Sequence, residues 1–79
     1  MLELRLQHKS KLQEFLVKTK KIRPEYKVLS TSGPEHNKTF HVALYINGQE
    51  MLHATSNSRK KAEQKAAYDY LKKNNLINE

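Results

Sequence analysis

Cysteine is absent from this 79-residue chain, and glycine and proline occur only twice each. Without cysteine, neither a disulfide bond nor a thiolate metal site can form. With two glycines, there is no glycine-rich loop of the kind that cradles phosphates. No apolar run approaches the roughly 20 residues that span a bilayer, and no secretory signal peptide is visible. We therefore expect an intracellular, cytoplasmic protein without a membrane partner.

Acidic residues are also scarce, with 8 Asp and Glu against 15 Lys and Arg, a formal net charge of +7. This excess favours a polyanionic partner such as nucleic acid over an anionic membrane surface, because no helix pairs a bulky apolar face with a basic one. The sequence contains no Ser-His-Asp arrangement, and its four histidines do not follow a zinc-binding spacing. We expect no catalytic residue, no metal site, no cofactor and no small-molecule substrate in this chain.

The length supports one small domain, which we place at residues 9–76. Residues 1–8 are expected to be a linker or truncated lead-in, and residues 77–79 a tail. A first helix is predicted at about residues 9–20, because an inward stripe follows helical spacing. That stripe consists of Leu12, Phe15, Leu16 and Thr19. The opposite face carries Ser10, Gln13, Glu14 and Val17.

Three strands are predicted next, at about Tyr26–Ser32, Thr39–Ile46 and Glu50–Thr55. The middle segment alternates apolar and polar residues, which is typical of a strand with one buried face. Asn47-Gly48 between the last two strands is the strongest short signal for a hairpin with a type I′ turn. The three strands should therefore form an antiparallel meander.

A second helix is predicted over Ser58–Asn74, where the small residues Ala62 and Ala66 allow close packing on the sheet. Lys61, Lys65, Tyr68 and Lys72 are expected on the outer face of this helix. The element order is α-β-β-β-α. It predicts an α+β fold with a three-stranded antiparallel sheet and two helices packed on one of its faces.

The start of this second helix carries charges of an unusual sign. Ser58 is a favourable N-cap, and the cations Arg59, Lys60 and Lys61 follow it directly. The positive end of a helix macrodipole normally attracts acidic residues. Cations at this end become favourable once an anion such as phosphate binds there, although a solvated, lysine-rich helix is the alternative interpretation.

Four motifs resemble the double-stranded RNA-binding domain. They are Pro24-Glu25-Tyr26, Gly33-Pro34-Glu35-His36, Phe40-His41-Val42 and the run from Ser58 to Ala67. The resemblance covers about residues 9–76. Two segments, Lys11-Leu12-Gln13-Glu14-Phe15 and Ala62-Glu63-Gln64, are most similar to the C-terminal domain of bacterial ribonuclease III.

The resemblance implies that the chain binds double-stranded RNA by shape, over about 16 base pairs. The first helix would enter one minor groove and contact 2′-hydroxyls and base edges through Ser10, Gln13 and Glu14. The loop residues Pro34, Glu35 and His36 would enter the next minor groove. Phosphates across the intervening major groove would be bound by Asn57, Ser58, Arg59 and Lys60.

The chain departs from the family pattern at two places. Where many members have glycines before the second helix, this sequence has Ala54-Thr55-Ser56-Asn57-Ser58, which does not predict a tight glycine turn. Where many members have a third lysine one turn into the helix, this sequence has Glu63. Arg59 and Lys60 are therefore expected to be the main phosphate contacts.

The resemblance further implies that the chain is the substrate-binding domain of a ribonuclease III, an endoribonuclease that processes RNA, ribosomal RNA included. Its nuclease domain would lie upstream of Met1, because eight scattered acids do not form the carboxylate cluster that two-metal hydrolysis needs. Mg²⁺ would serve only that absent domain, and the parent enzyme would form a homodimer through it. The alternatives are a stand-alone RNA-binding adaptor or regulator and a protein-interaction domain. The retained Arg59-Lys60 pair argues against the latter.

Overall fold

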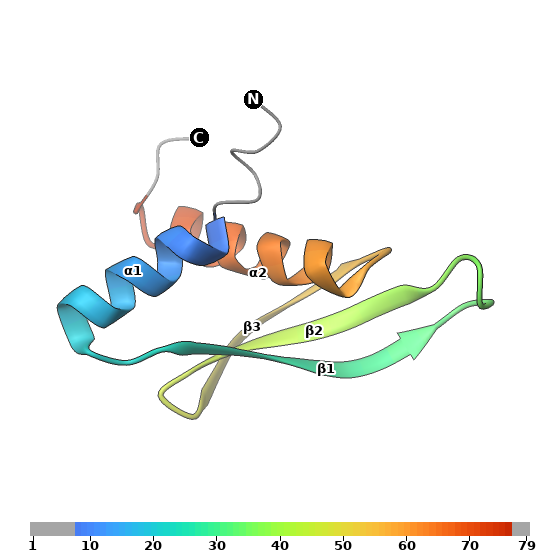
Figure 1. Cartoon of the computed structure of the whole chain (residues 1–79), viewed down its shortest axis with the longest axis horizontal. Helices are drawn as coiled ribbons and strands as arrows, with labels where there is room; N and C mark the ends of the chain where they lie inside the picture. Colours follow the sequence, from blue (N-terminus) through green and yellow to red (C-terminus); the bar gives the residue numbers. More distant parts are fainter. Residues whose placement is uncertain (1–7, 77–79) are drawn as a thin grey trace.

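The computed structural model describes residues 8–76 and has the predicted α-β-β-β-α order. The elements are α1 (His8–Lys20), β1 (Pro24–Ser32), β2 (Thr39–Ile46), β3 (Gln49–Ser56) and α2 (Arg59–Lys73). The strands form one antiparallel sheet in the order β1-β2-β3. Both helices cover the same face of this sheet (Figure 1), so the predicted fold class is confirmed. Apart from His8, the expected lead-in lies outside the described residues, as does the tail at 77–79.

Helix α1 buries a narrower stripe than its sequence pattern predicts. Leu12 and Leu16 are fully buried in the core, and Phe15 packs against it half-buried. Thr19 was expected to point inward, but it is exposed and its hydroxyl donates to the backbone carbonyl of Phe15 at 2.6 Å. A threonine hydroxyl satisfied by its own helix has no need of a partner in the core. The predicted outer face, which contains Ser10, Gln13, Glu14 and Val17, is exposed.

Helix α2 packs on the sheet through its small residues. Ala62, Ala66 and Ala67 are fully buried, which allows close approach of the helix to β2 and β3. Tyr68 was expected on the outer face, but it is half-buried because its ring packs edge-on against the His8 ring of α1, with centroids 4.8 Å apart. The contact between α1 and α2 therefore partly buries Tyr68, which the helical pattern of α2 alone would leave exposed to solvent.

The central strand β2 supplies the middle of the core. Val42, Leu44 and Ile46 are buried, as predicted. Ala43 belongs to the opposite side of the strand but is also fully buried, so burial does not alternate strictly along β2. The Asn47-Gly48 turn has φ values of 56° and 77°, so the type I′ geometry predicted for this hairpin is confirmed. The first strand begins at Pro24 rather than at Tyr26, which proline tolerates because β1 is an edge strand.

Candidate nucleic-acid interface

The outer face of α1 forms one shallow groove with the connection to β1. Ser10, Gln13 and Glu14 lie together because residues three and four apart share a helix face. The groove is lined by Ser10, Gln13, Glu14, Val17, Lys18 and Arg23. Its rim therefore combines a hydroxyl, an amide and a carboxylate with two cations, which are donors and acceptors suited to ribose hydroxyls. The structure brings the three predicted α1 residues together.

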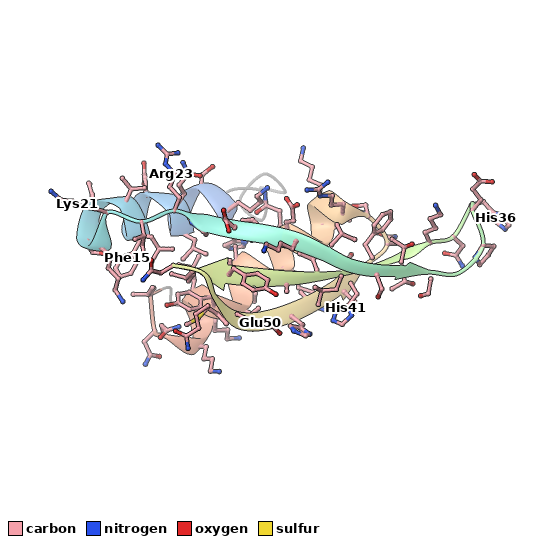
Figure 2. All side chains as sticks on the ribbon, turned by 90° about the horizontal axis from the view of Figure 1, so that it is seen from below. Phe15, Lys21, Arg23, His36, His41 and Glu50 are labelled. Atoms are coloured by element: carbon pink, nitrogen blue, oxygen red, sulfur yellow. The ribbon has the colours of Figure 1, made fainter. Side chains whose placement is uncertain are left out.

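Arg23 is a lining residue of this groove that the sequence analysis did not single out (Figure 2). It lies in the short connection after α1, directly before Pro24. The Pro24-Glu25-Tyr26 motif does not include Arg23, and only the fold brings this residue back beside α1. A guanidinium here offsets the negative charge of Glu14 in front of a polyanion.

The loop between β1 and β2 projects from the end of the sheet, with His36 far from the helices (Figure 2). Pro34, Glu35 and His36 are all exposed on it. The turn is closed by the Asn37 backbone N–H, which donates to the Pro34 carbonyl at 2.9 Å. Gly33 has φ +90°, and a Cβ there would meet the Asn37 oxygen at 2.6 Å, so only glycine fits. The three predicted loop residues therefore sit on a defined turn.

The third predicted region, Asn57 to Lys60, surrounds the N-terminus of α2. Ser58 has extended backbone angles, and its Oγ accepts a hydrogen bond from the Lys61 N–H at 3.1 Å, as an N-cap does. Its hydroxyl proton stays available to donate to a phosphate oxygen. The first turn of α2 carries no acidic residue, so its positive dipole end and its cations add to one another.

Arg59 is less free than predicted. Its Nε donates to the Glu63 carboxylate at 2.9 Å, although the Arg59 side chain remains 62% exposed. A guanidinium has five N–H donors, so this bond leaves its two terminal amino groups for an incoming anion. Lys60, by contrast, is exposed and forms no ion pair among the described residues. The two predicted phosphate contacts therefore differ in their protein partners.

Glu63 is buried where α1, α2 and β1 meet, and its carboxylate also accepts a hydrogen bond from the Lys9 ammonium of α1. Burial by itself raises the pKa of Glu63, but the hydrogen bonds and charges of Lys9 and Arg59 outweigh it and hold the pKa below its usual value. The Lys9 Nζ lies 5.0 Å from the centre of the Tyr26 ring. Burial, with Glu63 nearby, raises the pKa of Tyr26 well above its ordinary value. Neither the Ala62-Glu63-Gln64 resemblance nor the missing lysine at position 63 predicted this contact with α1.

The opposite face of the sheet carries a separate polar cluster (Figure 2). His41 Nε2 and His53 Nδ1 lie 3.0 Å apart, and His53 Nε2 contacts the Glu50 carboxylate. Within residues 8–76, no group of three or more His, Cys, Asp or Glu residues is arranged to hold a metal ion. Among the same residues, neither helix is long and apolar enough to cross a membrane.

The three predicted regions follow one another along the molecule. Figure 1 shows α1 toward one end of the long axis, the β1–β2 loop at the other end, and the start of α2 between them. The principal extents of the domain are 41 × 32 × 16 Å, so it is flat and elongated. A domain that recognises an RNA duplex by its shape needs this order, in which a phosphate contact lies between two minor-groove contacts.

Residues 8–74 match the family described as the double-stranded RNA binding motif. This chain belongs to that family. It is 39% identical over 69 residues to Ribonuclease 3 of Campylobacter fetus and 45% identical over 69 residues to Ribonuclease 3 of Myxococcus xanthus. Each match covers 87% of this chain but only 31% and 26%, respectively, of the relative. The predicted resemblance to double-stranded RNA-binding domains, and to ribonuclease III in particular, is confirmed.

Among solved structures, Dicer from Pichia stipitis contains a similar domain, with a TM-score of 0.68 and 29% sequence identity. That match covers 86% of this chain and 33% of the Dicer chain. The chain therefore spans about a quarter to a third of the length of these three proteins.

Proposed function

We propose that the domain reads the shape of an RNA double helix through three contacts in a row. The α1 groove enters one minor groove, the β1–β2 loop enters the next, and the start of α2 binds the phosphates between them. The observation that carries this proposal is the order of the three regions along the long axis (Figure 1). A footprint of about 16 base pairs follows from contacts to two successive minor grooves of A-form RNA.

The α1 groove supplies both partners that a 2′-hydroxyl needs. Gln13 and Ser10 donate and accept, whereas Glu14 only accepts and so binds a ribose hydroxyl proton rather than a phosphate. Lys18 and Arg23 on the same groove neutralise the repulsion between Glu14 and the nearby phosphates. Because DNA lacks the 2′-hydroxyl, this groove favours RNA over DNA.

The β1–β2 loop makes the second minor-groove contact through Pro34, Glu35 and His36. All three are exposed on a turn whose backbone is held by the Asn37 to Pro34 hydrogen bond. A loop that is already ordered loses little conformational entropy when it binds.

The start of α2 supplies most of the affinity. Lys60 and the terminal amino groups of Arg59 neutralise phosphates, and the Ser58 hydroxyl and the Asn57 amide donate to phosphate oxygens. The free N–H groups and the dipole at a helix N-terminus strengthen each of these contacts. Affinity should therefore fall steeply with salt concentration and depend little on base sequence.

In the whole protein, the domain would hold duplex RNA for the nuclease of a ribonuclease III-type enzyme. The matches to Ribonuclease 3 in two bacteria support this proposal, and each of them covers less than a third of the relative. The tethered domain would raise the local substrate concentration at a separate Mg²⁺-dependent catalytic domain. The chain alone would not cleave RNA, and the parent would act in the cytoplasm as a homodimer in RNA processing.

A fluorescence-anisotropy titration tests the binding proposal. The ligands are an RNA duplex longer than 16 base pairs, a DNA duplex of the same sequence, and one of the RNA strands alone. We expect the RNA duplex to bind tightest, with most affinity lost for the other two. Comparable affinities for RNA and DNA duplexes would contradict the role of the 2′-hydroxyl, and preference for the single strand would contradict duplex recognition. Incubation of the same RNA with Mg²⁺ and this chain should leave it intact.

A further inference from the structure

Two consecutive residues of α2, Glu63 and Gln64, hold the first turn of α1. The Glu63 carboxylate accepts from the Lys9 ammonium of α1 and from Arg59 Nε of α2. The Gln64 side-chain oxygen accepts from the backbone N–H of Lys9 at 3.1 Å. Lys9 is thus bound to α2 through both its side chain and its backbone, which fixes the start of α1 in position and direction.

Both side chains that make this connection are nearly inaccessible to solvent. Glu63 is 7% exposed and Gln64 is 9% exposed. The side chains of their cationic partners Lys9 and Arg59 are 34% and 62% exposed, so only the carboxylate of this ion-pair network is buried. A buried carboxylate loses its hydration, and its ion pairs therefore add little net stability to the fold. Its geometry is nevertheless strict, since each lost hydrogen bond would leave an unpaired polar group in the interior. These hydrogen bonds are therefore better suited to orienting α1 against α2 than to raising the stability of the fold.

The connection joins two of the three contact regions directly. Lys9 immediately precedes Ser10, the first residue of the α1 groove. On α2, Arg59 lies between Ser58 and Lys60, and its bond to Glu63 orients the guanidinium while leaving its terminal amino groups free. The distance between the minor-groove contact and the phosphate contact therefore depends on Glu63.

We propose that Glu63, supported by Gln64, is a positioning residue for duplex RNA, which fixes the spacing between α1 and the start of α2 without touching the ligand. This inference rests on the proposed function, because it concerns the fit of those two regions to A-form RNA. It assigns a role in RNA selection to a carboxylate in a protein that binds a polyanion.

Simple electrostatics and the positioning role predict opposite changes in RNA affinity when this carboxylate is removed. If charge alone mattered, neutralising Glu63 would raise the net charge and strengthen binding to any polyanion. If Glu63 positions the two regions, its loss weakens binding to RNA and leaves binding to DNA unchanged or tighter. Glu25 is a matched control, because it is an exposed carboxylate on β1, where the same neutral substitution changes charge alone.

The experiment compares Glu63→Gln, Glu25→Gln and the unmodified chain. Each binds an RNA duplex and the matching DNA duplex, at a temperature where circular dichroism shows all three folded. We expect Glu25→Gln to bind both ligands as tightly as the unmodified chain or slightly tighter. For Glu63→Gln we expect RNA affinity to fall by about threefold to tenfold, which is the usual size of coupling between contacting groups. Its ratio of RNA to DNA affinity should fall by at least as much.

Two results with Glu63→Gln would overturn the proposal, and a double variant gives a third test. One is Glu63→Gln behaving as Glu25→Gln does, and the other is an equal loss of RNA and DNA affinity, which a smaller folded fraction would produce. Lys9→Met breaks the connection from the α1 side and should lower the RNA-to-DNA ratio similarly. The double variant of Lys9 and Glu63 should lose little more of that ratio than either single variant, and additive losses would contradict the proposal. If the unmodified chain itself does not prefer RNA, the proposed function fails instead.

Discussion

Replacing Arg59 and Lys60 together by alanine removes the two cations nearest the N-terminus of α2. Each phosphate contact contributes about 0.7–0.9 to the slope of log affinity against log salt, so the double variant should flatten that slope by about 1.4–1.8. A hydrogen bond to a charged group contributes about 1.5–3 kcal/mol. Loss of two such contacts should therefore weaken RNA binding at least tenfold, which corresponds to about 1.4 kcal/mol.

The matched control is Lys72→Ala with Lys73→Ala, which removes two positive charges from the other end of the same helix. Binding is measured by fluorescence anisotropy on the same RNA duplex at four salt concentrations, for both double variants and the unmodified chain. The control should change the slope by much less, because its charges act only at a distance. An unchanged slope for the Arg59 and Lys60 variant, or an equal change in the control, would refute specific phosphate contacts at this helix start.

Three further predictions concern single residues of the described fold. Ser58→Ala should lower the free energy of unfolding by about 1 kcal/mol through loss of the N-cap, whereas Ser58→Asp should keep the cap but weaken RNA binding by repelling phosphate; thermal denaturation and anisotropy separate the two effects. The pKa of Glu63 is lower in the folded protein than its ordinary value of 4.5, so the ionised carboxylate stabilises the fold fully above pH 4.5, and this stabilisation is lost as the pH falls through the folded pKa. Glu63→Gln should therefore make the melting temperature less dependent on acid pH. An unchanged dependence of melting temperature on pH would contradict this role of Glu63. Gly33→Ala should distort the β1–β2 loop, because a Cβ would lie 2.6 Å from the backbone oxygen of Asn37. RNA affinity should then fall, while the NMR resonances of core residues keep their positions. Shifted core resonances or an unchanged RNA affinity would contradict this prediction.

The strands and helices were predictable because local patterns agree with the tertiary fold. The Asn47-Gly48 turn and the Ser58 cap each act through neighbouring residues, and both appear as expected. The pattern from Thr39 to Ile46 predicted the strand itself, but not the burial of Ala43 on its other side. The predicted orientations of Thr19 and Tyr68 were wrong, because the burial of each side chain depends on which group it contacts. The ring of Tyr68 packs against His8, and the hydroxyl of Thr19 donates to the Phe15 carbonyl of its own helix.

The sequence predicted the candidate interface as a list of residues, but not how those residues are connected in the structure. The α1 residues, the loop and the helix start each came from a motif. Their common order on the molecule came only from the fold (Figure 1). Glu63 lies 54 residues from Lys9 in the chain, so helical spacing pointed only to its partner Arg59 four residues before it. Arg23 was missed for the same reason, since its neighbours in the groove belong to α1.

The central claim is that three separate regions contact one RNA duplex at the same time. An NMR titration of the ¹⁵N-labelled chain with an RNA duplex longer than 16 base pairs tests it most directly. We predict that amide shifts concentrate in residues 10–14, 34–36 and 57–60 and saturate at a common RNA concentration. Shifts confined to one region, or centred on the His41 and His53 face of the sheet, would contradict it.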